Sequence, residues 1–313
     1  MDNPLRDILD HQRTVILDGG LATTLEGHGY DLDDPLWSAR LLLDEPEAIA
    51  RVHTEFLAAG ADVITTATYQ ASLPGLATRG VSADEAVTLI RSGVELAVRA
   101  RDTFWADTAN RQGRHRPLVA ASVGPYGAYL ADGSEYDGRY GVDAETLRGF
   151  HRGRLEILAD GGADLLACET MPSFDEIEVL LGLLAERPRQ WAWISFCCRD
   201  GERLWDETPV AEAARACARV GNVIAVGINC TAPRFVAALV GEMGAACDLP
   251  ILAYPNAGET YLPESKTWIA AEDSASPLAA APDWVAAGVR GVGGCCRVGP
   301  AAIAKLRRSL LAP

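Results

Sequence analysis

Three of the eight cysteines stand where two separate apolar segments end, and their positions suit metal binding. Cys230 follows the run VIAVGIN at 223–229, and the adjacent pair Cys295 and Cys296 follows GVRGVGG at 288–294. The two glycines before the pair allow a sharp turn, so both sulfurs can face one ion. Three thiolates select Zn²⁺ among the common ions, and three protein ligands leave a fourth position open for a substrate. The spacing therefore predicts a catalytic zinc site.

An alternative interpretation stays open for every cysteine, because buried thiols often act as small apolar residues. Cys168 adjoins Glu169 at a strand end, so its position does not decide between the two roles. We assign the apolar role to Cys197, Cys198, Cys217 and Cys247.

Two carboxylates occupy similar positions. Asp18 in LDGG and Glu169 in ACET each stand where an apolar run gives way to a loop. A single carboxylate there often caps the next helix, whereas two on one rim can bind a substrate ammonium group. None of the five histidines stands at a strand end, which argues against a histidine ligand or general base.

Eight short apolar runs position these residues, and they alternate with longer segments of helical periodicity. The runs are continuously apolar, as in parallel strands that are covered on both faces. We expect strands at 14–18, 61–66, 118–123, 163–167, 191–196, 223–228, 250–253 and 288–292. We expect helices at 46–59, 82–100, 147–159, 173–185, 209–220 and 233–243, the second with a capping box that begins at Ser82.

This alternation predicts one α/β domain over residues 1–313, a (β/α)₈ TIM-type barrel with its zinc at the C-terminal face of the strands. An open doubly wound sheet is the alternative, but the glycines at 291–294 lack the third glycine of a dinucleotide-binding loop. Residues that follow the strands should line the site. Those that we expect to bind substrate are Asp18, Gly19, Thr66, Tyr126, Glu169 and Asn229.

Composition narrows the classes of partner. The chain has 28 basic and 43 acidic residues, a net charge of −15, which argues against binding to nucleic acid or to an anionic membrane. No apolar run approaches the roughly 20 residues of a membrane span, and no secretory signal is visible. We therefore expect a cytoplasmic protein with reduced cysteines, either a monomer or a homodimer.

Seven segments in chain order resemble the homocysteine S-methyltransferases. They are ILDGGLATTLE at 16–26, ITTATYQAS at 64–72, ASVGPYGAYLADGSEYDG at 121–138, ACETMPSFDE at 167–176, GINCTAP at 227–233, YPNAGE at 254–259 and GVGGCCR at 291–297. The likeness spans the whole chain and is strongest to the stand-alone branch that uses S-methylmethionine or S-adenosylmethionine.

The resemblance implies a zinc-bearing barrel that makes methionine from homocysteine and a sulfonium donor. The zinc cysteines of the family match Cys230, Cys295 and Cys296, and its two homocysteine-binding carboxylates match Asp18 and Glu169. The charges suit this reaction, because a thiolate and a sulfonium neutralise each other during transfer and need no general base.

Three other functions remain as alternatives. A betaine-dependent homocysteine methyltransferase would carry aromatic residues where this chain has Gln70 and Thr170. A Schiff-base lyase needs a strand-end lysine, but Lys266 and Lys305 are the only lysines. A barrel that only binds zinc or thiols would differ by lacking an exchangeable fourth zinc ligand.

The segment 124–142 is the expected wall of the donor pocket. It has five glycines and four tyrosines, so it can approach a ligand closely and offer aromatic faces to a sulfonium. The aromatic candidates are Trp37, Tyr126 and Tyr129.

Overall fold

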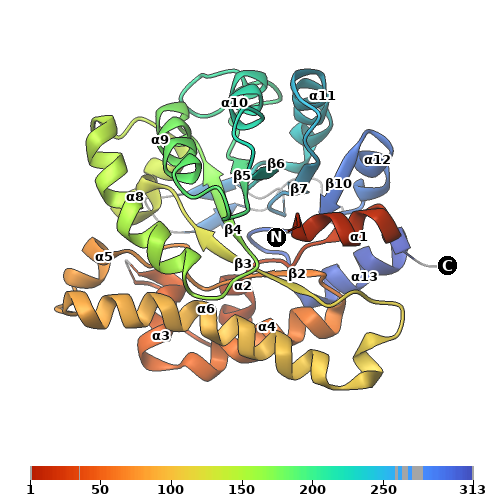
Figure 1. Cartoon of the computed structure of the whole chain (residues 1–313), viewed down its shortest axis with the longest axis horizontal. Coiled ribbons are helices and arrows are strands. Elements are labelled where there is room, and N and C mark those ends of the chain that lie inside the picture. The colour runs from red at the N-terminus through yellow and green to blue at the C-terminus, as the bar shows by residue number, and fades with distance from the viewer. Residues whose placement is uncertain (1, 35, 258–259, 263–266, 270–277, 312–313) are drawn as a thin grey trace.

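An eight-stranded parallel sheet forms the centre of the computed structural model, which describes residues 2–34, 36–257, 260–262, 267–269 and 278–311 (Figure 1). The strand order is β1-β10-β7-β6-β5-β4-β3-β2, and a bridge between Leu17 and Val63 joins the first strand to the last. This closed ring confirms the predicted (β/α)₈ barrel. Its strands are β1 Val15–Ile16, β2 Val63–Thr65, β3 Leu118–Val123, β4 Leu165–Met171, β5 Ala192–Phe196, β6 Val223–Asn229, β7 Ile251–Tyr254 and β10 Val289–Val292.

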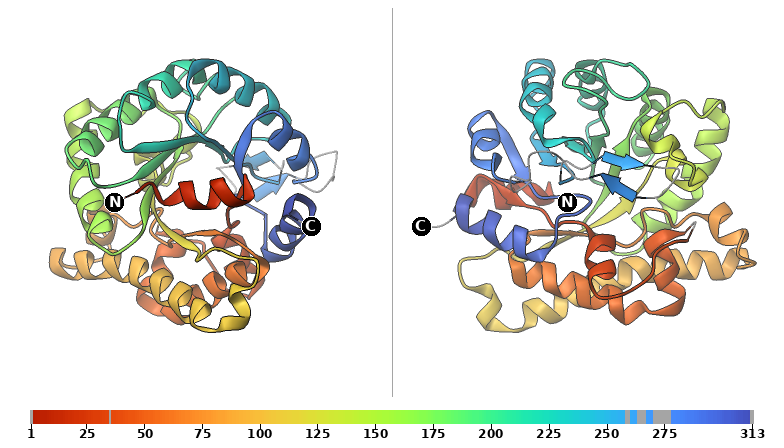
Figure 2. Two further views of the ribbon diagram at one scale, coloured as in Figure 1. Left: turned by 45° about the vertical axis from the view of Figure 1, so that its right-hand side comes forward. Right: turned by 180° about the vertical axis from the view of Figure 1, so that it is seen from behind.

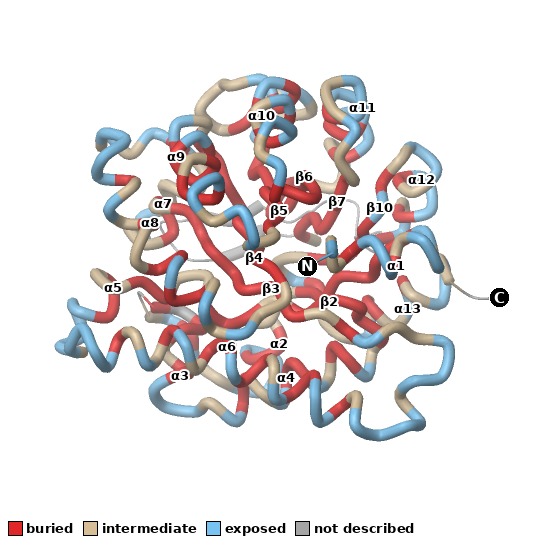
Figure 3. The backbone as a smooth tube through the Cα atoms, in the orientation of Figure 1, coloured by how far each residue is buried: buried red, intermediate tan, exposed pale blue. Residues whose placement is uncertain are grey.

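Helices surround the barrel, with their inner faces buried and their outer faces exposed (Figure 3). The predicted capping box is confirmed, because the Ser82 side chain accepts a hydrogen bond from the Glu85 backbone and the Glu85 carboxylate accepts one from the Ser82 backbone. No described helix combines the length and apolar character that a membrane span requires. The helices of the ring are α2 Leu21–Gly27, α3 Leu41–Asp44, α4 Pro46–Ala59, α5 Leu73–Ala77, α6 Ala83–Ala106, α8 Ala144–Ala159, α9 Phe174–Ala185, α10 Val210–Cys217, α11 Val236–Ala246, α12 Ala281–Ala286 and α13 Pro300–Leu311.

The two ends of the barrel are covered differently. Helix α1 (Pro4–Gln12) lies across the end where the strands begin, and its Leu5 and Ile8 are buried there (Figure 2). The short ribbon of β8 (Thr260–Leu262) and β9 (Thr267–Ile269) lies at the other end, seen from behind in Figure 2. A cavity of the protein lies at that end, where the strands terminate.

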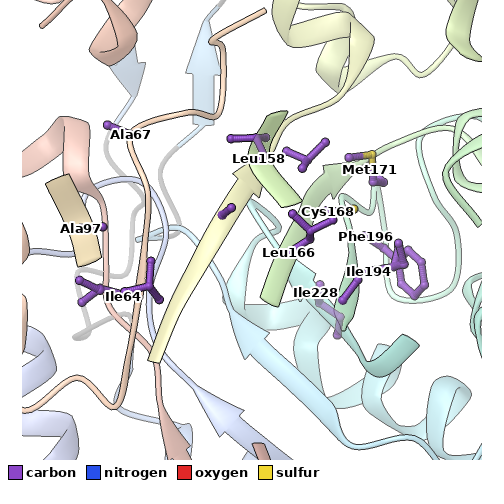
Figure 4. Close-up of a cluster of buried hydrophobic side chains, with 14 of the residues drawn as sticks. Ile64, Ala67, Ala97, Leu158, Leu166, Cys168, Met171, Ile194, Phe196 and Ile228 are labelled. Carbon is purple, nitrogen blue, oxygen red and sulfur yellow. The ribbon is translucent and has the colours of Figure 1, made fainter. Parts of the chain in front are cut away.

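The main hydrophobic core lies between the sheet and the helices, and Figure 4 shows part of it. Cys168 belongs to this core, beside Leu166 and Met171, and burial raises the pKa of its thiol to about 12. Its role is thus the apolar one. A second cluster fills the inside of the barrel and includes Trp193, whose indole N–H donates to the Tyr254 hydroxyl at 3.0 Å.

His53 on α4 gives a prediction about acid stability. The imidazole is fully buried, has no hydrogen-bond partner among the described residues, and burial lowers its pKa to about 4. Since the unfolded histidine binds a proton near pH 6.5, stability from neutral His53 is lost as the pH falls from 6.5 towards 4. We expect His53→Leu to reduce the loss of unfolding free energy between pH 7.5 and pH 5 by about 2 kcal/mol.

Urea titrations at the two pH values measure this difference. His11→Gln is the control, because His11 is exposed at the end of α1. This substitution should leave the pH dependence of the unfolding free energy unchanged. An equal loss of stability in His53→Leu and wild type would contradict the assignment.

Candidate active site

A cavity of about 530 Å³ opens at the ends of the barrel strands, where active sites of such barrels lie. Residues from several strands and from the segment after β3 line it. The predicted metal ligands and all but one of the residues that we expect to bind substrate meet here. They are Asp18, Gly19, Thr66, Glu169, Asn229, Cys230, Cys295 and Cys296.

The three cysteines form a cluster that can hold a metal ion. Their sulfurs lie within 4.8 Å of one another, with Cys230 Sγ 2.7 Å from Cys295 Sγ and 3.9 Å from Cys296 Sγ. A tetrahedral set with zinc–sulfur bonds of about 2.3 Å separates its sulfurs by about 3.8 Å. The 3.9 Å pair fits that spacing, and the 2.7 Å pair must open by about 1 Å. Hydrogen bonds from Cys230 and Cys296 lower the pKa of Cys295.

Unusual backbone geometry brings these sulfurs together. Cys230 has a φ of 47°, a left-handed conformation that is uncommon for a residue with a side chain and that recurs at functional sites. Gly293 and Gly294 follow the end of β10 at Val292, and a Cβ atom on Gly294 would overlap the Val298 side chain. A Cβ atom on Gly19 would likewise collide with the carbonyl oxygen of Val298. A Cβ atom on Gly293 would lie 2.7 Å from the Asp18 carbonyl oxygen, and one on Gly20 would lie 2.8 Å from that of Cys295. The glycines therefore let the DGG and GGCC segments pack directly against each other.

Two buried carboxylates, Asp18 and Glu169, line the cavity together with the cysteine cluster. Asp18 Oδ2 accepts a 2.7 Å hydrogen bond from the Thr65 backbone, and Glu169 Oε1 accepts one of 2.5 Å from the Ser122 hydroxyl. Burial raises the pKa of Asp18 to about 7 and that of Glu169 to about 8. Burial therefore disfavours the charged form of each carboxyl, and a cation bound beside it would favour that form.

Thr66 and Asn229 also line the cavity, but their side chains already have protein partners. The Thr66 hydroxyl lies 2.6 Å from that of Thr68 and accepts a hydrogen bond from the Ser122 backbone. Asn229 accepts a 2.7 Å hydrogen bond from the Thr170 backbone and donates another to the Thr170 hydroxyl. Asn229 thereby fixes Thr170, whose φ is 64°.

Tyr126, which we expected to bind substrate, is not among the residues that line the cavity. Its ring packs against Phe150 at a centroid distance of 5.0 Å and against Tyr129 at 5.6 Å, beside helix α8. Tyr129 is in the same aromatic group, and the Trp37 side chain lies outside the described residues. After β3 the chain forms a short helix, α7 (Tyr126–Leu130), which places these rings against Phe150. The position of Tyr126 after a strand could not reveal this helix.

Three other residues line the cavity instead, and the sequence analysis did not single them out. Tyr69 follows β2, while Glu135 and Tyr136 belong to a 3₁₀ turn, η3 (Ser134–Tyr136), of the segment after β3. Burial raises the pKa of the Tyr69 and Tyr136 phenols, and the charge of Cys230 raises it further. The segment 124–142 therefore lines the cavity through Tyr136 rather than Tyr126, and its role as the wall of a donor pocket stays a prediction.

The fold and the site together define the class of protein: a (β/α)₈ barrel enzyme with a cysteine cluster at the C-terminal ends of its strands. The family model for homocysteine S-methyltransferase matches residues 15–310, and the chain belongs to that family.

Individual relatives agree with this assignment. The homocysteine S-methyltransferase of Escherichia coli is 48% identical over 307 residues, which cover 98% of each chain. The homocysteine S-methyltransferase YbgG of Bacillus subtilis is 47% identical over 298 residues, or 95% of each chain. The crystal structure of the metallated form of the homocysteine methyltransferase MmuM from Escherichia coli superposes with a TM-score of 0.88 at 45% identity, over 98% of this chain and 100% of that one.

Proposed function

We propose that this chain transfers a methyl group from a sulfonium donor, S-methylmethionine or S-adenosylmethionine, to the thiolate of homocysteine, giving methionine. The observation that carries the proposal is that three convergent sulfurs share one cavity with two buried carboxylates. The single barrel of residues 1–313 would supply both substrate sites.

The cofactor in this proposal is Zn²⁺, held by Cys230, Cys295 and Cys296. Their all-sulfur donor set suits zinc and leaves room for one further ligand. When bound, the ion lowers the pKa of the substrate thiol, which is near 8.5 for a free thiol, and holds the sulfur as thiolate.

The other residues of the cavity bind and orient the substrates. Asp18 and Glu169 would bind the ammonium group of homocysteine, which directs its sulfur towards the cysteines. The reaction breaks one sulfur–methyl bond and forms another without moving a proton, so the protein has no need of a general base. Holding the two sulfurs in line about the methyl carbon is its main contribution.

We also propose a reducing, cytoplasmic setting. All eight cysteines are free, and three of them must remain thiolates for the site to work. Oxidation of the cluster would remove the ligands that the proposal requires.

An assay of methionine formation tests the proposed function. Purified zinc-loaded protein is given homocysteine with S-methylmethionine, S-adenosylmethionine or betaine, one donor at a time. We expect turnover with at least one sulfonium and none with betaine. Turnover with betaine alone would indicate the betaine-dependent branch, and zinc binding without any turnover would indicate a barrel that only binds metal.

A further inference from the structure

The charge of the cavity points to a second cation-binding position, an inference that rests on the proposed function. Among the described residues that line the cavity, seven carry carboxylates and none is basic. A sulfonium amino acid has two cationic groups, the sulfonium and the α-ammonium. The sulfonium must lie beside the homocysteine sulfur, so the ammonium must be bound elsewhere in the cavity. The seven carboxylates are Asp18, Glu26, Asp31, Asp33, Asp34, Glu135 and Glu169.

Most of these carboxylates are already engaged or lie in water. Asp18 and Glu169 are assigned to homocysteine. Asp34 pairs with Arg79, and the charge of Arg297 acts on Glu26. Three of the seven are exposed, namely Glu26, Asp31 and Asp33.

Glu135 is the remaining carboxylate of the cavity, and the protein leaves part of its hydrogen-bonding capacity unused. Its Oε2 atom is buried and has no hydrogen-bond partner among the described residues. Burial raises the pKa of this carboxyl to about 7, a hydrogen bond from the backbone of Glu135 itself opposes the rise, and the charge of Asp132 adds to it. The residue as a whole is half-buried, and a carboxylate with one buried, unpaired oxygen is expected to gain a partner when a cationic ligand binds.

The segment that carries Glu135 is held at both ends by a second buried glutamate. Glu176 Oε1 accepts hydrogen bonds of 2.6 Å from the Tyr126 backbone and lies 2.6 Å from His151 Nε2, while Oε2 accepts one of 2.9 Å from the Tyr140 hydroxyl. Between these two anchors, Gly127 packs so closely on the Glu135 backbone that a Cβ atom there would lie 2.5 Å from its nitrogen. Glu135 is therefore presented by an anchored turn.

Two aromatic residues line the same cavity as Glu135 and the sulfur cluster. They are Tyr69, which follows β2, and Tyr136, which is next to Glu135 in the chain. Burial raises the pKa of both phenols, and the charge of Cys230 raises it further. A donor that extends from the cluster to Glu135 would pass these rings, which can stabilise its sulfonium.

We propose that Glu135 binds the α-ammonium group of the sulfonium donor and thereby selects amino-acid sulfonium compounds over donors that lack this group. Two donors that differ only in the amino group test it: S-methylmethionine and 4-(dimethylsulfonio)butanoate. The kcat/KM of zinc-loaded wild type, Glu135→Gln and Asp137→Asn is measured with each donor at saturating homocysteine. Asp137 is the matched control, because it is an exposed carboxylate of the same segment.

We expect Glu135→Gln to lower kcat/KM for S-methylmethionine by about 10- to 100-fold, mainly through KM, since a hydrogen bond to a charged group is lost. Its kcat/KM for the deaminated donor should change by less than about 3-fold, and Asp137→Asn should resemble wild type with both. Zinc content and the KM for homocysteine show whether the variant is correctly folded, and Glu135→Asp, which keeps the charge, should recover part of the loss.

Other results would overturn this proposal. If Glu135→Gln lost the same factor of kcat/KM with both donors, the carboxylate would not contact the ammonium. The same would follow if the variant kept the wild-type kcat/KM for S-methylmethionine. Absence of sulfonium turnover in the wild type would instead overturn the proposed function, and with it the role of Glu135.

Discussion

Cys296→Ala is expected to lose its zinc and to form methionine at least about 1,000-fold more slowly than the wild type, a barrier increase of about 4 kcal/mol. The substitution leaves two of three sulfurs in a cluster whose atoms otherwise lie within 4.8 Å of one another. Without the ion, the homocysteine thiol is mostly protonated at pH 7 and is a poor nucleophile. Zinc per chain by elemental analysis and methionine formation are the two measurements.

Cys217→Ala is the matched control for this experiment. Cys217 is a buried free thiol on α10, outside the residues that line the described cavity, and burial raises its pKa. The chemical change is the same, so zinc content and turnover should remain near wild type. Full activity in Cys296→Ala, or equal losses in the two variants, would contradict the assignment of the cluster.

The residues that follow strands were predictable because a barrel brings strand ends to one rim. Apolar runs place the eight strands within a few residues, and β3 is found at the predicted 118–123. Asp18, Glu169 and Cys230 then follow from counting to the end of each run. The strand β4 extends past Glu169 to Met171, because Met171 still pairs with Phe196.

The structure of the segment after β3 was not predictable in the same way. Its sequence shows glycines and tyrosines but not which tyrosine faces the cavity. That choice depends on distant contacts, such as the hydrogen bond from the Tyr126 backbone to Glu176, fifty residues further on. Glu135 was missed for the same reason, since nothing in a local pattern shows that a loop carboxylate will be buried.

The other large effect that we expect concerns Asp18 and Glu169. If they bind the homocysteine ammonium, Glu169→Gln should raise KM for homocysteine and lower kcat/KM by about 10- to 100-fold, with zinc content unchanged. The comparison substrate is 4-mercaptobutyrate, which is homocysteine without its amino group. Wild type should use it poorly, and Glu169→Gln should discriminate much less between the two thiols.

Asp175→Asn is the control for this pair, because Asp175 is an exposed carboxylate at the start of α9. It should retain the wild-type preference for homocysteine over mercaptobutyrate. If wild type used mercaptobutyrate as well as homocysteine, the two buried carboxylates would need another role.

The preference for homocysteine over mercaptobutyrate should also depend on pH. Burial raises the pKa of Asp18 to about 7 and that of Glu169 to about 8, so both carboxyls become neutral as the pH falls through this range. A neutral carboxyl attracts an ammonium group much less, and the ratio of kcat/KM for the two thiols should fall between pH 8.5 and pH 6.5. The ammonium group lowers the pKa of the homocysteine thiol relative to that of mercaptobutyrate, so each kcat/KM is first corrected for the measured ionisation of its own thiol. A ratio that stayed constant over this range would show that these carboxyls do not hold the amino group.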